Sequence, residues 1–201
     1  NDKQRTLYPD HLLHQKQGKI RYVKDTSEQS FISLSFPSFK YSDNRRDYAM
    51  ILISEILTGY MNSKLYTVLR QKEGLIYHIN SGSKFYEDLG VFVISCTTKN
   101  KKSEVTRCMQ LLLKTVTELS RTVTKEDIDS SKKHLLESIQ LGKNEPHFVG
   151  AEYTQDLYHL GKVFTLDEKI KTVKSIQLQD IVSVAKRVFQ PKLCCISYSG
   201  S

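Results

Sequence analysis

The chain has 201 residues, 39% of them apolar and 26% charged, with a formal net charge of +8. This composition is typical of a globular protein and excludes an intrinsically disordered chain. No apolar run approaches the roughly 18 residues of a membrane-spanning helix, so no membrane span is expected. Because the basic residues are spread along the chain, we interpret the charge as a solvated surface and expect no nucleic-acid partner.

The four cysteines favour a reducing compartment. None of Cys96, Cys108, Cys194 and Cys195 forms a C-x-x-C pair, so a zinc knuckle is not expected. Three of the four lie in apolar runs, where a free cysteine behaves as a small hydrophobic residue. We therefore expect an intracellular location, in the cytoplasm or the mitochondrial matrix.

The first half of the chain predicts pairs of strands with helices between them. Residues 1–18 have no clean hydrophobic period and are predicted to be an arm or linker. The predicted elements are strands over residues 19–24 and 30–36, a helix from the cap Asp43 to Gly59, a helix over 62–72, and strands over 75–84 and 90–98 joined by a turn at Glu87 and Asp88. The last strand is apolar on both faces from Val91 to Cys96, so we expect it to be covered on both sides.

The second half is predicted to be helical until a final strand. Thr124 with Asp127, and Thr165 with Glu168, have the spacing of capping boxes at two helix starts. We also expect a helix capped by Ser103, with an apolar stripe from Val105 to Leu119. Another helix should contain Phe148, Ala151, Leu157 and Leu160 and end at Gly161. The chain should finish with a helix over 178–189, which Pro191 stops, and a strand over 192–199.

Because the strands come in pairs, we predict an α+β fold with a mixed, mostly antiparallel sheet and helices stacked on one face. The sequence indicates no second core and no low-complexity linker. We therefore predict one domain over residues 19–201, after the arm.

The residues alone offer no complete catalytic set. A zinc peptidase needs two histidines one helical turn apart, with a glutamate that takes the proton from the metal-bound water. His11-Leu-Leu-His14 lacks the glutamate, and in His134-Leu-Leu-Glu137-Ser138 a serine stands where the second histidine is needed. We interpret His134 and Glu137 as a solvated pair and predict no metal site in this chain.

One segment, from Leu69 to Tyr77, combines groups that can hold a peptide. A helix ends near Arg70, Gly74 turns the chain, and a strand begins with Tyr77, so the two polar tips can converge at the strand end. Both side chains donate hydrogen bonds of the kind a peptide carbonyl accepts. The alternative is structural: an arginine favoured at a helix end by the dipole, and a tyrosine half buried in the sheet.

This segment resembles the C-terminal half-domain of the pitrilysin (insulinase-type) family of zinc metallopeptidases, which includes the mitochondrial processing peptidases. The run from Arg70 to Tyr77 is similar to the family's Arg-x-Lys-x-Gly-Leu-x-Tyr segment. The run Gly59-Tyr-Met-Asn-Ser-Lys-Leu65 resembles the segment before it, and the run from Gly90 to Thr97 resembles the strand after it. One departure is Gln177, which stands where the family has a Thr or Ser helix cap.

The resemblance implies a half-domain that closes with a homologous half over a peptide substrate. The homologous half, on the same polypeptide or on a separate subunit, is expected to carry the zinc, and this chain to carry no cofactor. By the same resemblance, Arg70 fixes the substrate backbone and Tyr77 stabilises the oxyanion in trans. Two alternatives stay open: a homodimer, and a catalytically inactive scaffold subunit, because the family also contains members that have lost catalysis.

Overall fold

A computed structural model describes residues 17–41, 45–86 and 89–200. Most of the predicted arm, the expected cap Asp43 and the turn at Glu87 and Asp88 lie outside these residues. The elements are β1 (Ile20–Lys24), β2 (Gln29–Ser38), α1 (Arg45–Ser54), η2 (Glu55–Gly59), η3 (Tyr66–Lys72), β3 (Ile76–Phe85), β4 (Gly90–Lys99), α2 (Lys102–Thr117), α3 (Leu119–Thr122), α4 (Lys125–Gly142), α5 (Pro146–Leu160), α6 (Leu166–Ser175), α7 (Leu178–Val188), η4 (Pro191–Leu193) and β5 (Cys195–Gly200).

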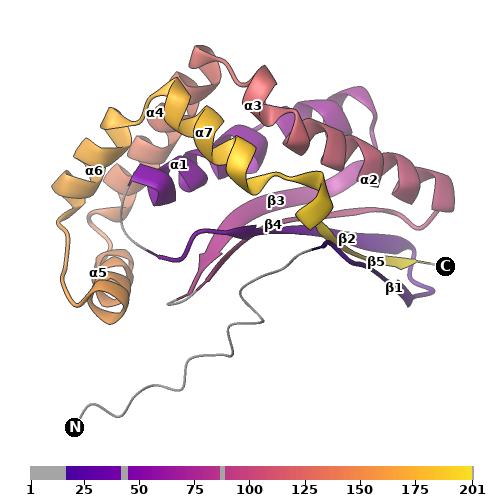
Figure 1. Ribbon diagram of the computed structural model, residues 1–201, viewed down its shortest axis with the longest axis horizontal. Helices are drawn as coiled ribbons and strands as arrows, with labels where there is room; N and C mark the ends of the chain where they lie inside the picture. Colours follow the sequence, from indigo (N-terminus) through magenta and orange to yellow (C-terminus); the bar gives the residue numbers. More distant parts are fainter. Residues whose placement is uncertain (1–16, 42–44, 87–88, 201) are drawn as a thin grey trace, which may run out of the picture.

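The strands form one sheet in the order β1-β5-β2-β4-β3. Only the β1–β5 pair is parallel among the described strands, which confirms the predicted α+β fold with a mixed, mostly antiparallel sheet. Helices α1, α2 and α7 lie over one face of this sheet, as Figure 1 shows. Ile32, Leu34 and Phe36 of β2 point into that layer and are fully buried, whereas Phe31 on the other face is 49% exposed.

The expectation that β4 is covered on both sides is wrong. Phe92 and Ile94 are fully buried under the helices, but Val91 and Val93 lie on the helix-free face and are half-buried. In the sheet register Val91 is opposite Pro37 and Val93 is opposite Ser35 of β2. These cross-strand neighbours cover part of each valine side chain, where we had expected a second layer of the fold to cover it.

The two helices predicted before β3 end where expected but differ in type. The first continues beyond Ser54 as the π-helix η2 up to Gly59, and the second is the π-helix η3 over its last seven residues. A Cβ atom on Gly59 would lie 2.1 Å from Oε2 of Glu55, so this glycine makes room for that carboxylate. Apolar spacing in the sequence does not distinguish such a π-helical turn from an α-helical one.

The local capping signals were predictive where a side chain makes the cap. The structure confirms both capping boxes, at Thr124 with Asp127 and at Thr165 with Glu168. The expected cap at Ser103 is wrong, because the N–H of Lys101 bonds to the carbonyl of Lys99 directly after β4 and the helix starts at Lys102.

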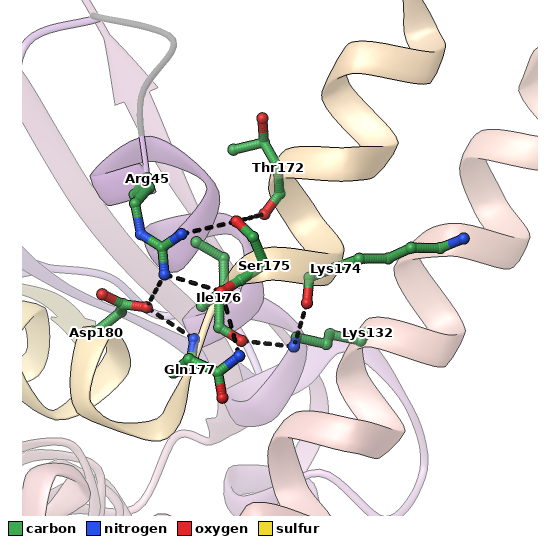
Figure 2. Close-up of polar contacts among 8 residues, drawn as sticks. All are labelled: Arg45, Lys132, Thr172, Lys174, Ser175, Ile176, Gln177 and Asp180. Carbon is green, nitrogen blue, oxygen red and sulfur yellow. Dashed lines mark hydrogen bonds and ion pairs between the residues drawn. The ribbon is translucent and has the colours of Figure 1, made fainter.

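Two cations from α1 and α4 fix the junction between α6 and α7, and Figure 2 shows them converging on its carbonyl groups. Arg45 donates to the hydroxyl of Ser175 (2.7 Å) and to its carbonyl (2.8 Å), and it pairs with Asp180 of α7 (2.5 Å). Lys132 donates to the carbonyl groups of Lys174 (3.0 Å) and Ile176 (2.5 Å). These bonds satisfy carbonyl groups that a helix C-terminus leaves without partners.

Helix α5 is attached to α6 by a buried ion pair, and only part of the apolar stripe that we expected is shielded, since Phe148 and Leu160 are half-buried. Ala151 and Leu157 are exposed, whereas Asp156 is fully buried. Lys169 of α6 lies 2.9 Å from carboxylate oxygens of both Asp156 and Glu152. Burial lowers the pKa of Lys169, but the hydrogen bonds to Glu152 and Asp156 outweigh it and leave the pKa raised.

None of the helices in the described part of the chain combines the length and the apolar character that a bilayer crossing demands.

Replacing Lys169 by methionine should destabilise the fold by about 3–5 kcal/mol, because a fully buried carboxylate on Asp156 would lose its countercharge. The free energy of unfolding from urea titration measures this effect. Lys171→Met, on an exposed position of the same helix, is the matched control and should change stability by less than about 0.5 kcal/mol. Equal stability of the two variants would contradict the assigned role of the buried pair.

Candidate functional site

The segment singled out by the sequence forms a corner between η3 and β3. Leu69 and Leu75, on the two sides of the turn, are buried. Gly74 between them has φ of 63°, in the left-handed region that favours glycine. The N–H of Leu75 donates to the carbonyl of Leu69 (2.8 Å) and that of Gly74 to the carbonyl of Arg70 (3.2 Å), so the helix end is satisfied within the turn.

Arg70 lies on the outer side of this corner, exposed to solvent. Its Nη1 donates to the hydroxyl of Tyr66 and to the main-chain carbonyl of Tyr77 (3.2 Å). The guanidinium carbon lies 5.1 Å from the centre of the Tyr66 ring. The guanidinium of Arg70 therefore contacts Tyr77 at its main-chain carbonyl. The sequence did not indicate this contact.

Tyr77 lies at an irregularity in the pairing of β3 with β4. Ile76 is opposite Thr98 and His78 is opposite Thr97, so Tyr77 is the extra residue of a β-bulge. Its side chain is 49% exposed, and its hydroxyl has no hydrogen-bond partner among residues 17–41, 45–86 and 89–200. A bulge at this position directs Tyr77 and His78 outward in succession, which regular alternation would not do.

Tyr66 is the site residue that the sequence reasoning missed. Its side chain is partly buried against the core, and its hydroxyl and ring both contact Arg70. The available signal was the spacing, because residues four apart on a helix lie on the same side. An apolar-stripe analysis takes such a tyrosine as core and ignores its polar end.

An ion pair anchors the end of η3 to α2. Arg107 of α2 donates to Glu73 at the end of η3 (2.8 Å), and this hydrogen bond raises the pKa of Arg107. Within the described part of the chain, no carboxylate lies within ion-pair distance of Arg70. The positive charge of Arg70 is thus available to a carbonyl dipole or an anion from outside.

The described residues do not fit a zinc site. No three His, Cys, Asp or Glu side chains gather within the described ranges as a metal would require. Nδ1 of His134 lies 2.6 Å from Oε2 of Glu55, so the partner of His134 is on η2 and is not Glu137 as we predicted. His11 and His14 lie outside the described residues.

A pocket of about 460 Å³ is lined by Thr67 and Val68 of η3 together with residues of α2 and α4. At its rim Lys64 pairs with Asp127 (2.8 Å), which also belongs to the capping box of α4. Burial raises the pKa of Asp127, but the hydrogen bonds from Lys64 and Thr124 outweigh it and lower the pKa overall. Neither Arg70 nor Tyr77 lines this pocket, so it is separate from the corner.

Known proteins share this fold and sequence pattern. The family model described as the peptidase M16 inactive domain matches residues 2–135. The chain is 27% identical over 173 residues to a protein named as an uncharacterized zinc protease from Rickettsia felis, and 28% identical over 187 residues to the uncharacterized zinc protease YmxG from Bacillus subtilis. Among solved structures, the peptidase M16 inactive domain from Pseudomonas fluorescens matches with a TM-score of 0.81 at 18% identity.

These matches cover most of this chain but less than half of each similar protein. They span 86% and 91% of this chain against 41% and 44% of the two curated relatives. The structural match spans 92% of this chain and 44% of the other, and its low identity makes it a statement about fold alone.

Replacing Gly74 by alanine should destabilise the chain by about 1–2 kcal/mol, because the left-handed conformation brings a Cβ atom close to the following carbonyl. Urea unfolding followed by circular dichroism measures the change.

Gly82→Ala is the matched control, since it adds the same methyl group to β3 where a Cβ atom meets no other atom within 4 Å. We expect it to leave stability within about 0.5 kcal/mol of the parent. A Gly74→Ala variant as stable as Gly82→Ala would show that the corner does not depend on the glycine.

Proposed function

The chain belongs to the peptidase M16 inactive-domain family, and on this premise we propose that it is the zinc-free, substrate-holding half of a zinc metalloendopeptidase. The observation that carries this proposal is the η3–β3 corner, where Arg70 and Tyr77 both present hydrogen-bond donors to the outside. A peptide in extended form offers carbonyl oxygens that such donors bind without regard to its side chains.

Tyr77 is proposed to stabilise the oxyanion that forms when water attacks the scissile carbonyl. A donor contributes most to catalysis when it is already oriented and has no competing partner. The bulge holds the main chain of Tyr77, and the phenol is exposed without an acceptor among the described residues. Both conditions support a donor that serves a group on another molecule.

Arg70 is proposed to hold the substrate main chain next to the reacting carbonyl. A guanidinium remains charged at every physiological pH and binds carbonyl or carboxylate oxygens through a rigid fork of N–H groups. The lack of a carboxylate near Arg70 in the described ranges leaves this charge available to a ligand. Positioning of this kind lowers the barrier by restricting the substrate before reaction.

The zinc and the residues that activate water are assigned to a homologous half-domain. The described residues of this chain do not supply a metal-binding set, so a homodimer of two such chains would not provide the hydrolytic centre from them. This favours a zinc-bearing half on the same polypeptide or on a separate subunit over a homodimer. A peptide enclosed between the two halves is the proposed substrate.

Reconstitution tests the proposal directly. The chain is mixed with a half-domain from the same organism that carries His-x-x-Glu-His, and cleavage of a quenched fluorescent peptide is followed. We expect no cleavage by either protein alone, cleavage by the mixture, and loss of cleavage with a zinc chelator. A mixture that forms a complex but cleaves nothing would overturn the proposal and favour the scaffold alternative.

In the reconstituted peptidase, Tyr77→Phe should lower kcat about 100-fold with little change in KM, because the donor acts on charge that develops only in the transition state. Steady-state kinetics on the same fluorescent peptide measure both constants.

Tyr86→Phe removes the hydroxyl of an equally exposed tyrosine just after the other end of β3 and is the matched control, with kinetics expected to equal the parent. A Tyr77→Phe variant with the parent kcat would show that the oxyanion role is wrong.

A further inference from the structure

Tyr66 and Arg70 form a unit within η3. The ring of Tyr66 is partly buried against the core, so its position is set by packing. Its hydroxyl accepts a hydrogen bond from Nη1 of Arg70, and its ring lies 5.1 Å from the guanidinium carbon. An exposed arginine has several rotatable bonds and samples many conformations, so two contacts from one anchored side chain restrict it strongly.

The distribution of hydrogen bonds on Arg70 is uneven. A guanidinium has five N–H donors, of which Nη1 carries two. The recorded bonds from Nη1 go to the hydroxyl of Tyr66 and to the carbonyl of Tyr77, whereas Nε and Nη2 bond to none of the described residues. The edge formed by Nε and Nη2 presents parallel donors and is the part of Arg70 that remains for a ligand.

From these contacts we infer that Tyr66 is a positioning residue, which holds Arg70 so that the Nε–Nη2 edge faces the substrate main chain. This inference rests on the proposed function and adds a residue to it. Tyr66 does not touch the reacting atoms. It acts through Arg70, by fixing the plane of the guanidinium before the peptide arrives, and such preorganisation increases affinity by reducing the entropy lost on binding.

A purely structural role for the same contacts is the main rival. β3 is an edge strand, and Ser54 also donates to one of its carbonyl groups, that of Ser81 (2.7 Å). If Arg70 only satisfied the carbonyl of Tyr77 in the same way, Tyr66 would contribute to stability and not to substrate binding. The two roles differ in which measured quantity changes.

The test uses the full chain reconstituted with its zinc-bearing half. Tyr66→Phe keeps the ring under the guanidinium and removes the hydroxyl, and Tyr66→Leu removes both contacts. We expect KM to rise about tenfold for Tyr66→Phe and further for Tyr66→Leu, with kcat within about twofold of the parent. Tyr22→Phe is the control, because it removes a tyrosine hydroxyl that donates to the carbonyl of Gly200, away from the corner, and should leave KM unchanged.

A double-mutant cycle gives the decisive readout. In an Arg70→Ala chain, Tyr66→Phe should raise KM no further, because a residue that acts through Arg70 has no effect once Arg70 is gone. An additive rise in KM in this background would overturn the inference, as would an unchanged KM in the single variant accompanied by a loss of stability in urea. Urea unfolding of every variant separates a poorly folded protein from one that binds substrate weakly.

The same experiment distinguishes this inference from the proposed function. If Arg70→Ala raises KM and Tyr66→Phe does not, the substrate-holding role of Arg70 stands and the positioning role of Tyr66 falls. If Arg70→Ala leaves KM unchanged, the assignment of Arg70 in the proposed function fails first.

Discussion

The left-handed turn at Gly74, held between the buried side chains of Leu69 and Leu75, determines where the groups of the candidate site lie. Burying a leucine contributes about 1.5–3 kcal/mol, so the two anchors offset a large part of the conformational entropy that the turn loses when it becomes ordered. The hydroxyl of Thr98 on β4 donates to the carbonyl of Leu75 (2.7 Å) and fixes the start of β3 as well. Since buried core residues hold this corner, Arg70 projects from a rigid support.

The fold could be predicted from sequence wherever burial or a local cap decides the structure. The alternation in β2 and the capping box at Thr124 belong to this class, because the residues that matter are within a few positions of each other. The mode of attachment of α5 could not be predicted, because Lys169 and Asp156 meet across two helices and neither position is apolar. The open side of β4 was missed for a related reason: an apolar strand sequence does not reveal what lies above each face.

The sequence predicted which residues form the candidate site, but it predicted less of how their side chains and main chain are arranged. The order Arg70, Gly74, Tyr77 is local and indicates a helix, a turn and a strand, but the roles of the two polar side chains came from the family resemblance. The bulge at Tyr77 depends on pairing with β4, which lies after the next turn of the chain, so no local pattern contains it. Only the position of Tyr66, one turn before Arg70, left a readable signal.

The helix-free face of the sheet also affects the thermodynamics of unfolding. The heat-capacity change of unfolding follows the apolar surface that water reaches when the chain unfolds. Side chains such as Phe31 are half hydrated in the native chain, so each adds less to that change than a fully buried side chain of the same kind would. A protein seated on this face would dehydrate them, and the complex would show a steeper dependence of its unfolding enthalpy on temperature than its parts do separately.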